Sequence, residues 1–563
     1  MIPAAPSGVS ASGAPARRHL LALELSTFAI AGPAALTVLA GSPGRLVFAL
    51  ALFLALPVTL LQVLREVHAY FARPRSLPEA TGKGPTCVVC VPVILRTPPD
   101  ADSLSAFIQR NAEALRRAAS PLVFLVDGPP SSQRDHLLDP AIQARVLARI
   151  GDPQEASVRP TVLWRNRQRT ASGDEWAGWE RKRGKVHRFL EMNAGQAVAD
   201  FIRLGAPATP IATPYVFVAD IDTTLLPGAL ERLVAKARHP ENDAAILTPR
   251  ILTPLAERRG RFTAMMGGRL AADEGPMPQA SLRQDRLGSD LFFGKGLIHG
   301  PRFLERLGDR LPDGIILSHD HIEGMMAGSA LASDVAVLES QPQTMSAWLH
   351  RQHRWIRGDA QNLAFVLPRV WQARPPRGAG LDALDRLELV FNCLGHFKPA
   401  AVLLMIADLV WTAPTAPVIW SAPLLLLWSG LAITVLDLAR PRPPRRSRTL
   451  ALDVAFQQLR AALGQLSFLP QSAVVAVHGL IIGLWRLLSA TDRGLEWPAG
   501  GGRRTGRWSA VGLLVGAAIL AGAVSRQGEV ATATGLLAIW TLSPFIWDPP
   551  PPPPAQEEPR CRT

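Results

Sequence analysis

Cysteine is scarce in this chain: its 563 residues include four, Cys87, Cys90, Cys393 and Cys561. Their scattered positions do not suggest a disulfide framework. Cys87 and Cys90 have the spacing of a metal-binding or redox pair, but no second cysteine pair or histidine cluster accompanies them. Their segment, Cys-Val-Val-Cys-Val-Pro-Val-Ile-Leu, is typical of a buried strand, so we expect structural cysteines there.

No segment alternates basic with aromatic residues, although basic residues are in excess. The 60 lysines and arginines outnumber the 46 acidic residues by 14, and arginine predominates. Nucleic-acid binding is one explanation of such a balance, but here the basic clusters flank apolar stretches. Basic cytoplasmic loops of a membrane protein explain that placement better. We therefore predict the lipid bilayer as a partner and no nucleic acid.

Apolar stretches long enough to cross a bilayer occur in both the first and the last part of the chain. The first two, at about 20–40 and 46–64, follow Arg17 and Arg18, and no clear small-residue cleavage site follows the first. We expect an anchoring hairpin rather than a removed signal peptide. Four further spans are expected at about 389–411, 417–438, 508–525 and 530–547.

The apolar stretch 472–488 has two interpretations. As a seventh span it would place the cluster Arg503–Arg507 outside while Arg440–Arg448 stays inside, against the positive-inside rule. We therefore expect amphipathic helices at the cytoplasmic interface over about 449–490. This gives six spans with both termini inside, and seven spans is the alternative.

Between the apolar parts, charge density rises and short apolar strands alternate with helical patterns. Strands are expected at Thr86–Leu95, Leu122–Val126, Tyr215–Ala219 and Ala244–Leu247, and a helix at Leu104–Ala119. Such alternation predicts a mostly parallel sheet with helices on its faces, in which ligands bind at the carboxyl ends of the strands.

The expected division of the chain therefore alternates membrane and cytoplasmic parts. It comprises a disordered N-terminus (1–16), a two-helix hairpin (17–66), an α/β domain (80–385), membrane helices 3 and 4 (386–440), interface helices with a cytoplasmic loop (441–506), membrane helices 5 and 6 (507–547) and a proline-rich disordered tail (548–563).

Aspartates follow two of the expected strands. Asp220 and Asp222 form an Asp-x-Asp after Tyr-Val-Phe-Val-Ala, and two such carboxylates can hold Mg²⁺ or Mn²⁺ against a nucleotide diphosphate. Asp127 ends Leu-Val-Phe-Leu-Val and could accept hydrogen bonds from a uracil or ribose, although a turn-forming Asp-Gly is an equal alternative.

A basic segment precedes a helical pattern at Val186–Asn193. We expect a loop at Glu180-Arg-Lys-Arg-Gly-Lys185 that lies against phosphates, with a solvated charge run as the alternative. The donor-binding residues predicted there are Glu180, Arg181, Lys182, Arg183 and Lys185.

Asp320 lies in Ile-Leu-Ser-His-Asp-His-Ile-Glu-Gly and is our candidate for the general base that deprotonates an acceptor hydroxyl. His319, His321 and Glu323 are close by. A metal site built from these groups is a less favoured alternative. For the acceptor we expect contacts from His319 and from the glycine-containing loop Phe293, Gly294, Lys295 and Gly296, which permits close backbone approach.

The string His350-Arg-Gln-His-Arg-Trp-Ile-Arg-Gly-Asp359 is the most specific short motif. Trp355 suits stacking on an acceptor sugar, and Arg354 suits pairing with a pyrophosphate. An amphipathic helix with an interfacial tryptophan is the alternative. An aspartate at a strand end, an Asp-x-Asp, a lone downstream aspartate and an Arg-Trp, in this order, indicate a membrane-embedded, metal-dependent sugar transferase.

With these motifs the chain resembles the processive, inverting family 2-like glycosyltransferases. Their D, D-x-D, T-E-D and Q-x-x-R-W series corresponds here to Asp127, Asp220/Asp222, Asp320 and Arg354/Trp355, with Arg351 in the place of the glutamine. The chain is more similar to the glycosyltransferase domain of cyclic β-1,2-glucan synthases (family 84 glycosyltransferases). The segments that carry this similarity are Trp179–Lys185, Asp220–Asp222 with Pro227, Phe292–Gly296, Leu317–Gly324, Arg351–Asp359 and Gly494–Trp497.

The resemblance implies a GT-A-type (Rossmann-like) domain inserted between transmembrane helices in the bacterial cytoplasmic (inner) membrane and facing the cytoplasm. It also implies UDP-glucose as donor, a divalent cation, inversion at the anomeric carbon and a growing β-1,2-glucan as acceptor. The phosphorylase-like and cyclising modules of the large synthases have no counterpart before Thr563. We therefore expect either a linear product or a separate enzyme that trims or closes it.

Three rival functions stay open at this point. The chain could polymerise another UDP-sugar, or add single sugars to a lipid-linked acceptor. It could also be a non-catalytic export scaffold that kept the fold, although four aspartates together with Arg354 and Trp355 count against this.

Overall fold

The structure is a computed structural model. It describes residues 13–82, 84–150, 159–170, 175–205, 213–254, 261–266, 280–308, 310–314, 316–366, 381–412, 417–428, 435–436, 448–489, 510, 512–519, 521 and 530–548. The segment Gly494–Trp497 and the proline-rich run after Asp548 lie outside these residues, as do 1–12. Residues 13–16, expected to be disordered, belong to a helix.

A nine-stranded sheet forms the centre of the α/β domain, with the strand order β6-β3-β2-β1-β7-β10-β9-β11-β8. Its strands are β1 (Val88–Ile94), β2 (Leu122–Asp127), β3 (Thr161–Arg165), β6 (Phe201–Leu204), β7 (Tyr215–Val218), β8 (Thr224–Leu225), β9 (Ile246–Leu252), β10 (Gly296–His299) and β11 (Ser329–Leu338). The short strands β4 (Gln168–Arg169) and β5 (Trp176–Ala177) pair separately.

The sheet is mixed, which corrects the expectation of a mostly parallel one. Strands β3, β2, β1 and β7 run parallel, as do β9 and β11. Strand β10 is antiparallel to both β7 and β9, and the edge strands β6 and β8 are antiparallel to their neighbours. The sequence signal for β10 is only four residues long, too short to indicate its direction.

Apolar side chains alternate between the two faces of the sheet, as the period of a strand requires. Val89 and Val91 of β1 join one core, which also contains Phe107, whereas Val88 and Cys90 join the other, which contains Phe189. The first face is covered by α3 (Asp102–Arg117), α4 (Asp139–Ile150) and α6 (Ala229–Arg238), and the second by α5 (Arg181–Asn193), α10 (Gly300–Leu307) and α11 (Asp320–Ala327).

The two neighbouring cysteines therefore lie in different cores. Cys87 belongs to one face of the sheet and Cys90 to the other, and both are buried. Burial raises the pKa of the Cys87 thiol to about 12 and also raises that of Cys90. The structural interpretation of this pair is confirmed, because thiols on opposite faces cannot share a metal or form a redox pair.

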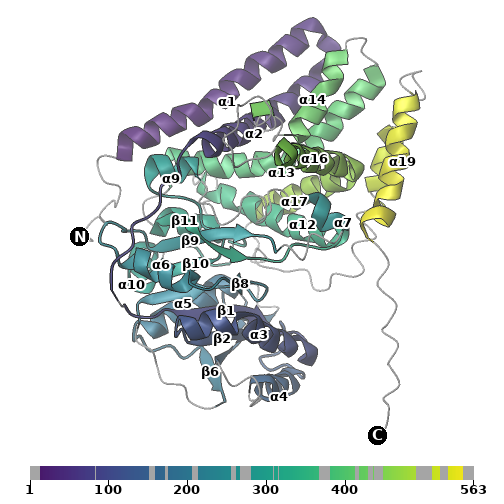
Figure 1. The fold of residues 1–563 in the computed structure, drawn as a ribbon. Coiled ribbons are helices and arrows are strands. Elements are labelled where there is room, and N and C mark those ends of the chain that lie inside the picture. Colours follow the sequence, from purple (N-terminus) through teal and green to yellow (C-terminus); the bar gives the residue numbers. More distant parts are fainter. Residues whose placement is uncertain are drawn as a thin grey trace.

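The long apolar helices lie beside the sheet domain, and Figure 1 shows α1, α2, α13 and α14 on the far side of α12 from the sheet. Within the described residues, four helices are long and apolar enough to cross a membrane: Ala14–Gly41 in α1 (Gly13–Gly41), α2 (Leu46–Phe71), α13 (Ala383–Thr412) and α17 (Leu469–Leu488). The other helices are α7 (Arg261–Met266), α9 (Leu282–Leu287), α12 (Met345–Asn362), α14 (Pro417–Leu427), α16 (Arg448–Ser467) and α19 (Val530–Trp547).

Helix α17 falls in the segment expected at the membrane interface, although its length and composition would allow it to span. One face packs on α12, where a Cβ added at Gly483 would lie 2.6 Å from the Cβ of Ala360. Ile481, Trp485 and Leu488 are exposed. Such a helix, apolar on its exposed side and packed on a polar helix on the other, suits the membrane interface. We therefore keep the prediction of six spans, with α17 lying at the interface.

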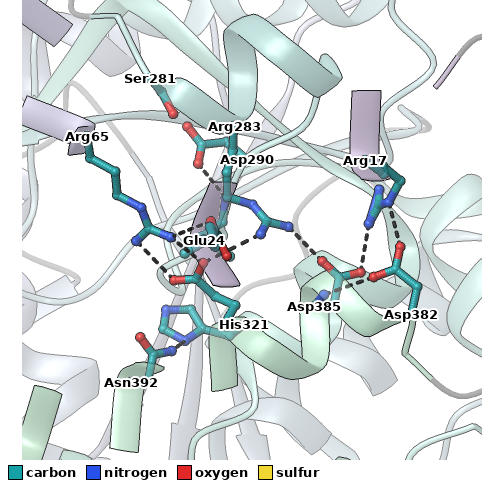
Figure 2. Close-up of polar contacts among 12 residues, drawn as sticks. Arg17, Glu24, Arg65, Ser281, Arg283, Asp290, His321, Asp382, Asp385 and Asn392 are labelled. Carbon is teal, nitrogen blue, oxygen red and sulfur yellow. Dashed lines mark hydrogen bonds and ion pairs between the residues drawn. The ribbon is translucent and has the colours of Figure 1, made fainter. Parts of the chain in front are cut away.

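Ion pairs with buried carboxylates join the apolar helices to the sheet domain (Figure 2). Arg65 of α2 contacts Glu388 of α13 at 2.5 Å and Glu24 of α1 at 3.2 Å. Arg283 of α9 contacts Asp385 of α13 at 2.6 Å. The network therefore ties three apolar helices to a helix that belongs to the sheet domain.

Candidate functional site

Three carboxylates gather at the edge of the sheet. Asp220 and Asp222 follow β7, and Glu339 follows β11. One carboxylate oxygen from each of the three lies within 4.8 Å of the others. Strand β8, which begins just after Asp222, pairs antiparallel with the end of β11, and this pairing brings Glu339 to the Asp-x-Asp.

The sequence analysis missed Glu339. It is a single acid after a strand, without a motif, and its only signal is the apolar Ala-Val-Leu before it. In the fold it matters electrostatically, because burial and then the negative charges of Glu339 and Asp220 raise the pKa of Asp222. A cluster of carboxylates in which one is held toward its neutral form favours the arrival of a cation.

Two lysines flank the carboxylate cluster. Lys182 Nζ lies 2.6 Å from Asp220 Oδ1, and Lys295 Nζ lies 2.9 Å from Asp220 Oδ2 and 2.6 Å from Glu339 Oε2. Burial alone would raise the pKa of Asp220, but the two ammonium groups lower it below its usual range. Lys295, predicted to contact the acceptor, contacts Asp220 and Glu339 in the structure.

The donor set fits a divalent cation. Carboxylate oxygens are the ligands that Mg²⁺ and Mn²⁺ prefer, and the cluster supplies one from each of three residues. Asp220 is 32% exposed and Glu339 15% exposed at the side chain, so the cluster is open on one side. That opening leaves room for ligands from a phosphate or water.

The basic segment is helical, which corrects the expectation of a loop. Helix α5 begins at Arg181. Both Arg181 and the preceding Glu180 have a positive φ, of 50° and 49° respectively. Lys182 reaches Asp220, whereas Arg183 pairs with Glu180 at 2.6 Å. Glu180 also accepts a hydrogen bond from the backbone of Gly314 at 2.5 Å. Only part of this segment therefore faces the carboxylate cluster.

Asp127 is buried in an ion-pair cluster of its own. Arg165 donates to both of its carboxylate oxygens, at 2.7 and 2.8 Å, and Lys185 Nζ lies 3.0 Å away. Burial opposes ionisation of Asp127, but these cations lower its pKa. Burial lowers the pKa of Lys185 to about 8 and that of Arg181 to about 10. The side chains of Asp127 and Lys185 are thus engaged with each other inside the protein.

Asp320 lies against the glycine-containing loop. Gly294 has a φ of +79°, and a Cβ added there would lie 2.7 Å from Asp320 Oδ2. The Gly294 carbonyl accepts a hydrogen bond from Lys182 at 3.0 Å. Lys182 therefore connects the Asp-x-Asp to the loop beside Asp320, although these groups are far apart in the sequence. Gly296, the last residue of the predicted loop, begins β10.

The remaining groups around Asp320 come from α11 and the same loop. His319 Nδ1 lies 2.9 Å from Glu323 Oε2 and 3.4 Å from Asp320 Oδ1. These three are the second group in the described residues that could hold a metal ion. Phe293 is 53% exposed, and its ring meets His321 edge-on at 5.1 Å.

The Arg-Trp motif lies on α12, as its helical alternative predicted. Trp355 is 42% exposed, with the Arg351 guanidinium 4.7 Å from its ring centroid. Burial lowers the pKa of Arg354, and the charge of Asp220 acts in the opposite direction, which places Arg354 on the side of the carboxylate cluster. Asn362 of α12 also donates to the Ser318 carbonyl at 2.7 Å, next to the Asp320 turn.

Helix α12 is braced on its other side as well. Asp359 pairs with His396 of α13 at 2.7 Å, and His353 contacts His478 of α17 at 2.8 Å. The site is therefore assembled from β7, β11, α5, α11, α12 and the loop before β10. It gathers Asp220, Asp222, Lys182, Lys295, Gly294, Asp320 and Arg354, whereas Asp127, Glu180, Arg183 and Lys185 are engaged in separate ion pairs.

Comparison with known proteins places this site in context. No protein-family model matches the chain. The chain is 26% identical over 581 residues to the cyclic beta-(1,2)-glucan synthase NdvB of Rhizobium meliloti (strain 1021), covering 93% of this chain and 20% of that protein. It thus spans about a fifth of the length of the curated relative that it matches. The resemblance to cyclic β-1,2-glucan synthases is confirmed.

Among solved structures, the chain is similar to the mannosyltransferase PcManGT from Pyrobaculum calidifontis in complex with GDP-Man and Mn²⁺. The TM-score is 0.39 at 14% identity, over 74% of this chain and 98% of that one.

Proposed function

We propose that this chain is a membrane-bound, inverting glucosyltransferase that builds a β-1,2-glucan processively from UDP-glucose. The observation that carries the proposal is the contact of Lys182 with both Asp220 and the loop beside Asp320. It brings a candidate diphosphate site next to a candidate general base, as sugar transfer requires. The similarity to a cyclic β-(1,2)-glucan synthase supports a glycosyltransferase role and suggests the sugar and the linkage.

The diphosphate of the donor is proposed to lie at the carboxylate cluster. Asp220, Asp222 and Glu339 would hold Mg²⁺ or Mn²⁺, which supplies positive charge to the departing diphosphate. Lys182 adds positive charge at the same place, and Arg354 offers a guanidinium on the same side. Asp127 and the remaining basic residues of 180–185 are proposed to form the wall against which the nucleoside rests.

Asp320 is proposed as the base. The acceptor hydroxyl oxygen bonds to the anomeric carbon while the bond from that carbon to the diphosphate breaks and its electron pair leaves on UDP. The hydroxyl proton passes to Asp320. One carboxylate is sufficient because the leaving group needs charge stabilisation rather than a proton. The exposed ring of Trp355 would stack on the acceptor sugar.

We place the catalytic domain on the cytoplasmic side of a bacterial inner membrane, with the apolar helices as anchor and as a guide for the growing glucan. The positive-inside distribution of arginine supports this orientation. A separate enzyme that trims or closes the product remains a proposed partner.

The detergent-purified protein, incubated with UDP-glucose and Mg²⁺ or Mn²⁺, tests the proposal. We expect a β-1,2-linked glucan by linkage-specific mass spectrometry and NMR, and its ends will show whether it is linear or cyclic. A product from another UDP-sugar alone would overturn the substrate. Absence of turnover and of UDP binding would favour the export scaffold.

Replacing Asp320 tests the base. Asp320→Asn should bind UDP with unchanged affinity and lose glucose transfer by at least about a hundredfold, because the carboxylate no longer accepts the hydroxyl proton. Asp243→Asn removes an exposed carboxylate that pairs with Arg306 away from the site, and it should transfer glucose normally. Full transfer by Asp320→Asn would rule out Asp320 as the base.

A further inference from the structure

The first turn of α11 holds an imidazole between two carboxylates. His319 precedes the helix, and Glu323 lies one turn later, so that the Glu323 backbone N–H donates to the His319 carbonyl at 2.9 Å. The same spacing places His319 Nδ1 2.9 Å from Glu323 Oε2 and 3.4 Å from Asp320 Oδ1. Because a single helical turn fixes all three residues, their geometry needs no other segment.

The three side chains differ in their access to solvent. Asp320 is 31% exposed, His319 12% and Glu323 7%. Asp320 is therefore the member of the group that faces the open site, and the other two lie behind it. On its other side, Gly294 leaves just enough room for Asp320 Oδ2, since a Cβ there would approach to 2.7 Å. The carboxylate is thus confined by an imidazole and by a glycine.

The charges that face the imidazole come from two helices. Asp320 and Glu323 of α11 lie beside it, and Lys182 of α5 acts on it from across the site. Arg183 and His187 of α5 interact electrostatically with Glu323. Burial and Lys182 oppose protonation of His319, but Glu323 and then Asp320 outweigh them and raise its pKa.

We propose that His319, held by Glu323, is a positioning residue for Asp320. This inference rests on the proposed role of Asp320 as the base. The protonated imidazole donates through Nδ1 to Glu323, and its positive charge, 3.4 Å from Asp320 Oδ1, holds that carboxylate in place while Oδ2 faces the acceptor hydroxyl. Glu323 does not touch the substrate and acts through His319. Activity should therefore depend on His319 being protonated and should fall as pH rises through its pKa.

The test removes the charge of Glu323 and preserves its shape. Glu323→Gln should lower kcat for glucose transfer by at least about tenfold, since small misplacement of a catalytic group costs up to about a hundredfold. UDP affinity should not change. The high-pH limb of the rate profile should move to lower pH, because His319 loses its proton earlier without the Glu323 charge. Glu323→Asp should restore part of the activity.

A matched control exists in α5. His187 and Glu191 form a pair with the same spacing at 3.3 Å, away from Asp320, so Glu191→Gln removes a similar contact. It should leave the rate and the pH profile at the wild-type values. If Glu323→Gln behaves like Glu191→Gln, or if its pH profile coincides with the wild type, the positioning role is wrong.

Histidine NMR separates this inference from the proposed function. In protein labelled at histidine, with the His319 signal assigned by His319→Gln, the titration of His319 should move to lower pH in Glu323→Gln. This readout needs no turnover. An unshifted titration would overturn the inference, whereas a shifted titration in a chain that transfers no sugar would overturn the proposed function and leave the coupling of Glu323 to His319 intact.

Discussion

A single residue without a motif completes the carboxylate cluster. Glu339 is brought to Asp222 by the pairing of β8 with β11, and Lys295 holds its position at 2.6 Å. The ion pair with Lys295 compensates the negative charge of Glu339 at the end of β11, where an unpaired charge would destabilise the fold. In the proposed metal site, the third carboxylate would add an oxygen ligand for a divalent ion.

Replacing Glu339 should weaken activation by metal. Glu339→Gln keeps the size of the side chain but loses the charged oxygen, so half-maximal transfer should require about 10- to 100-fold more Mn²⁺. The measurement is the transfer rate as a function of metal concentration. The control is Glu305→Gln, an exposed acid on α10, for which the metal dependence should not change. An identical metal dependence in both variants would remove Glu339 from the ligand set.

At the scale of elements, helix α12 carries Arg354 and Trp355 and is held between two apolar helices. Asp359 pairs with His396 of α13, and His353 contacts His478 of α17. Close approach of α17 depends on Gly479 and Gly483, since Cβ atoms there would lie 2.9 Å from the Ile356 side chain and 2.6 Å from the Ala360 Cβ. The placement of the Arg-Trp pair therefore depends on helix packing near the membrane.

A methyl group in this contact should displace α12. Gly483→Ala should lower the free energy of unfolding in detergent by about 1–3 kcal/mol, the usual cost of overpacking. It should also reduce glucose transfer more than UDP binding. Gly395→Ala is the control, because its Cβ would meet only a Val58 methyl at 3.6 Å. Equal stability and activity of the two variants would show that α17 does not position α12.

At the scale of the whole molecule, ion pairs with buried carboxylates connect the apolar helices with the sheet domain (Figure 2). Oε2 of Glu388 lies 2.5 Å from the Arg65 guanidinium and 3.5 Å from that of Arg283. A single carboxylate therefore pairs with arginines from both α2 and α9. Arg17 of α1 contacts Asp385 of α13 at 2.9 Å. Such pairs contribute little net stability while intact, and we expect them to act mainly by fixing the relative position of the helices.

Breaking this connection should be costly. Glu388→Gln leaves the buried Arg283 and the partly buried Arg65 without their shared charge, and it should lower the free energy of unfolding by about 3–5 kcal/mol in thermal or denaturant unfolding. Glu231→Gln, which removes a partly exposed pair with Arg117, should cost at most about 1 kcal/mol. A Glu388→Gln variant as stable as Glu231→Gln would show that the network does not hold the two parts together.

Much of the site was predictable because the signals are local. Asp220 and Asp222 follow a buried strand, Asp320 begins α11, and the Arg354-Trp355 pair lies on a helix, as period and composition indicate. The segment 180–185 was predicted as a loop because charge runs resemble loops, whereas packing on the sheet makes it helical. The direction of β10 and the role of α17 depend on partners that the local pattern does not specify.

The sequence by itself determined the apolar helices, the strand-end aspartates and the order of the motifs, because each depends on residues within one or two turns or strands. Tertiary structure alone decided which charges meet. Lys182 donates a hydrogen bond to the Gly294 carbonyl, which lies 112 residues away in the sequence. Glu339 reaches the Asp-x-Asp through the pairing of β8 with β11, and Asp127 contacts Arg165 inside the domain. These contacts depend on how the chain crosses the sheet, since distant side chains become neighbours only when the core between them is packed.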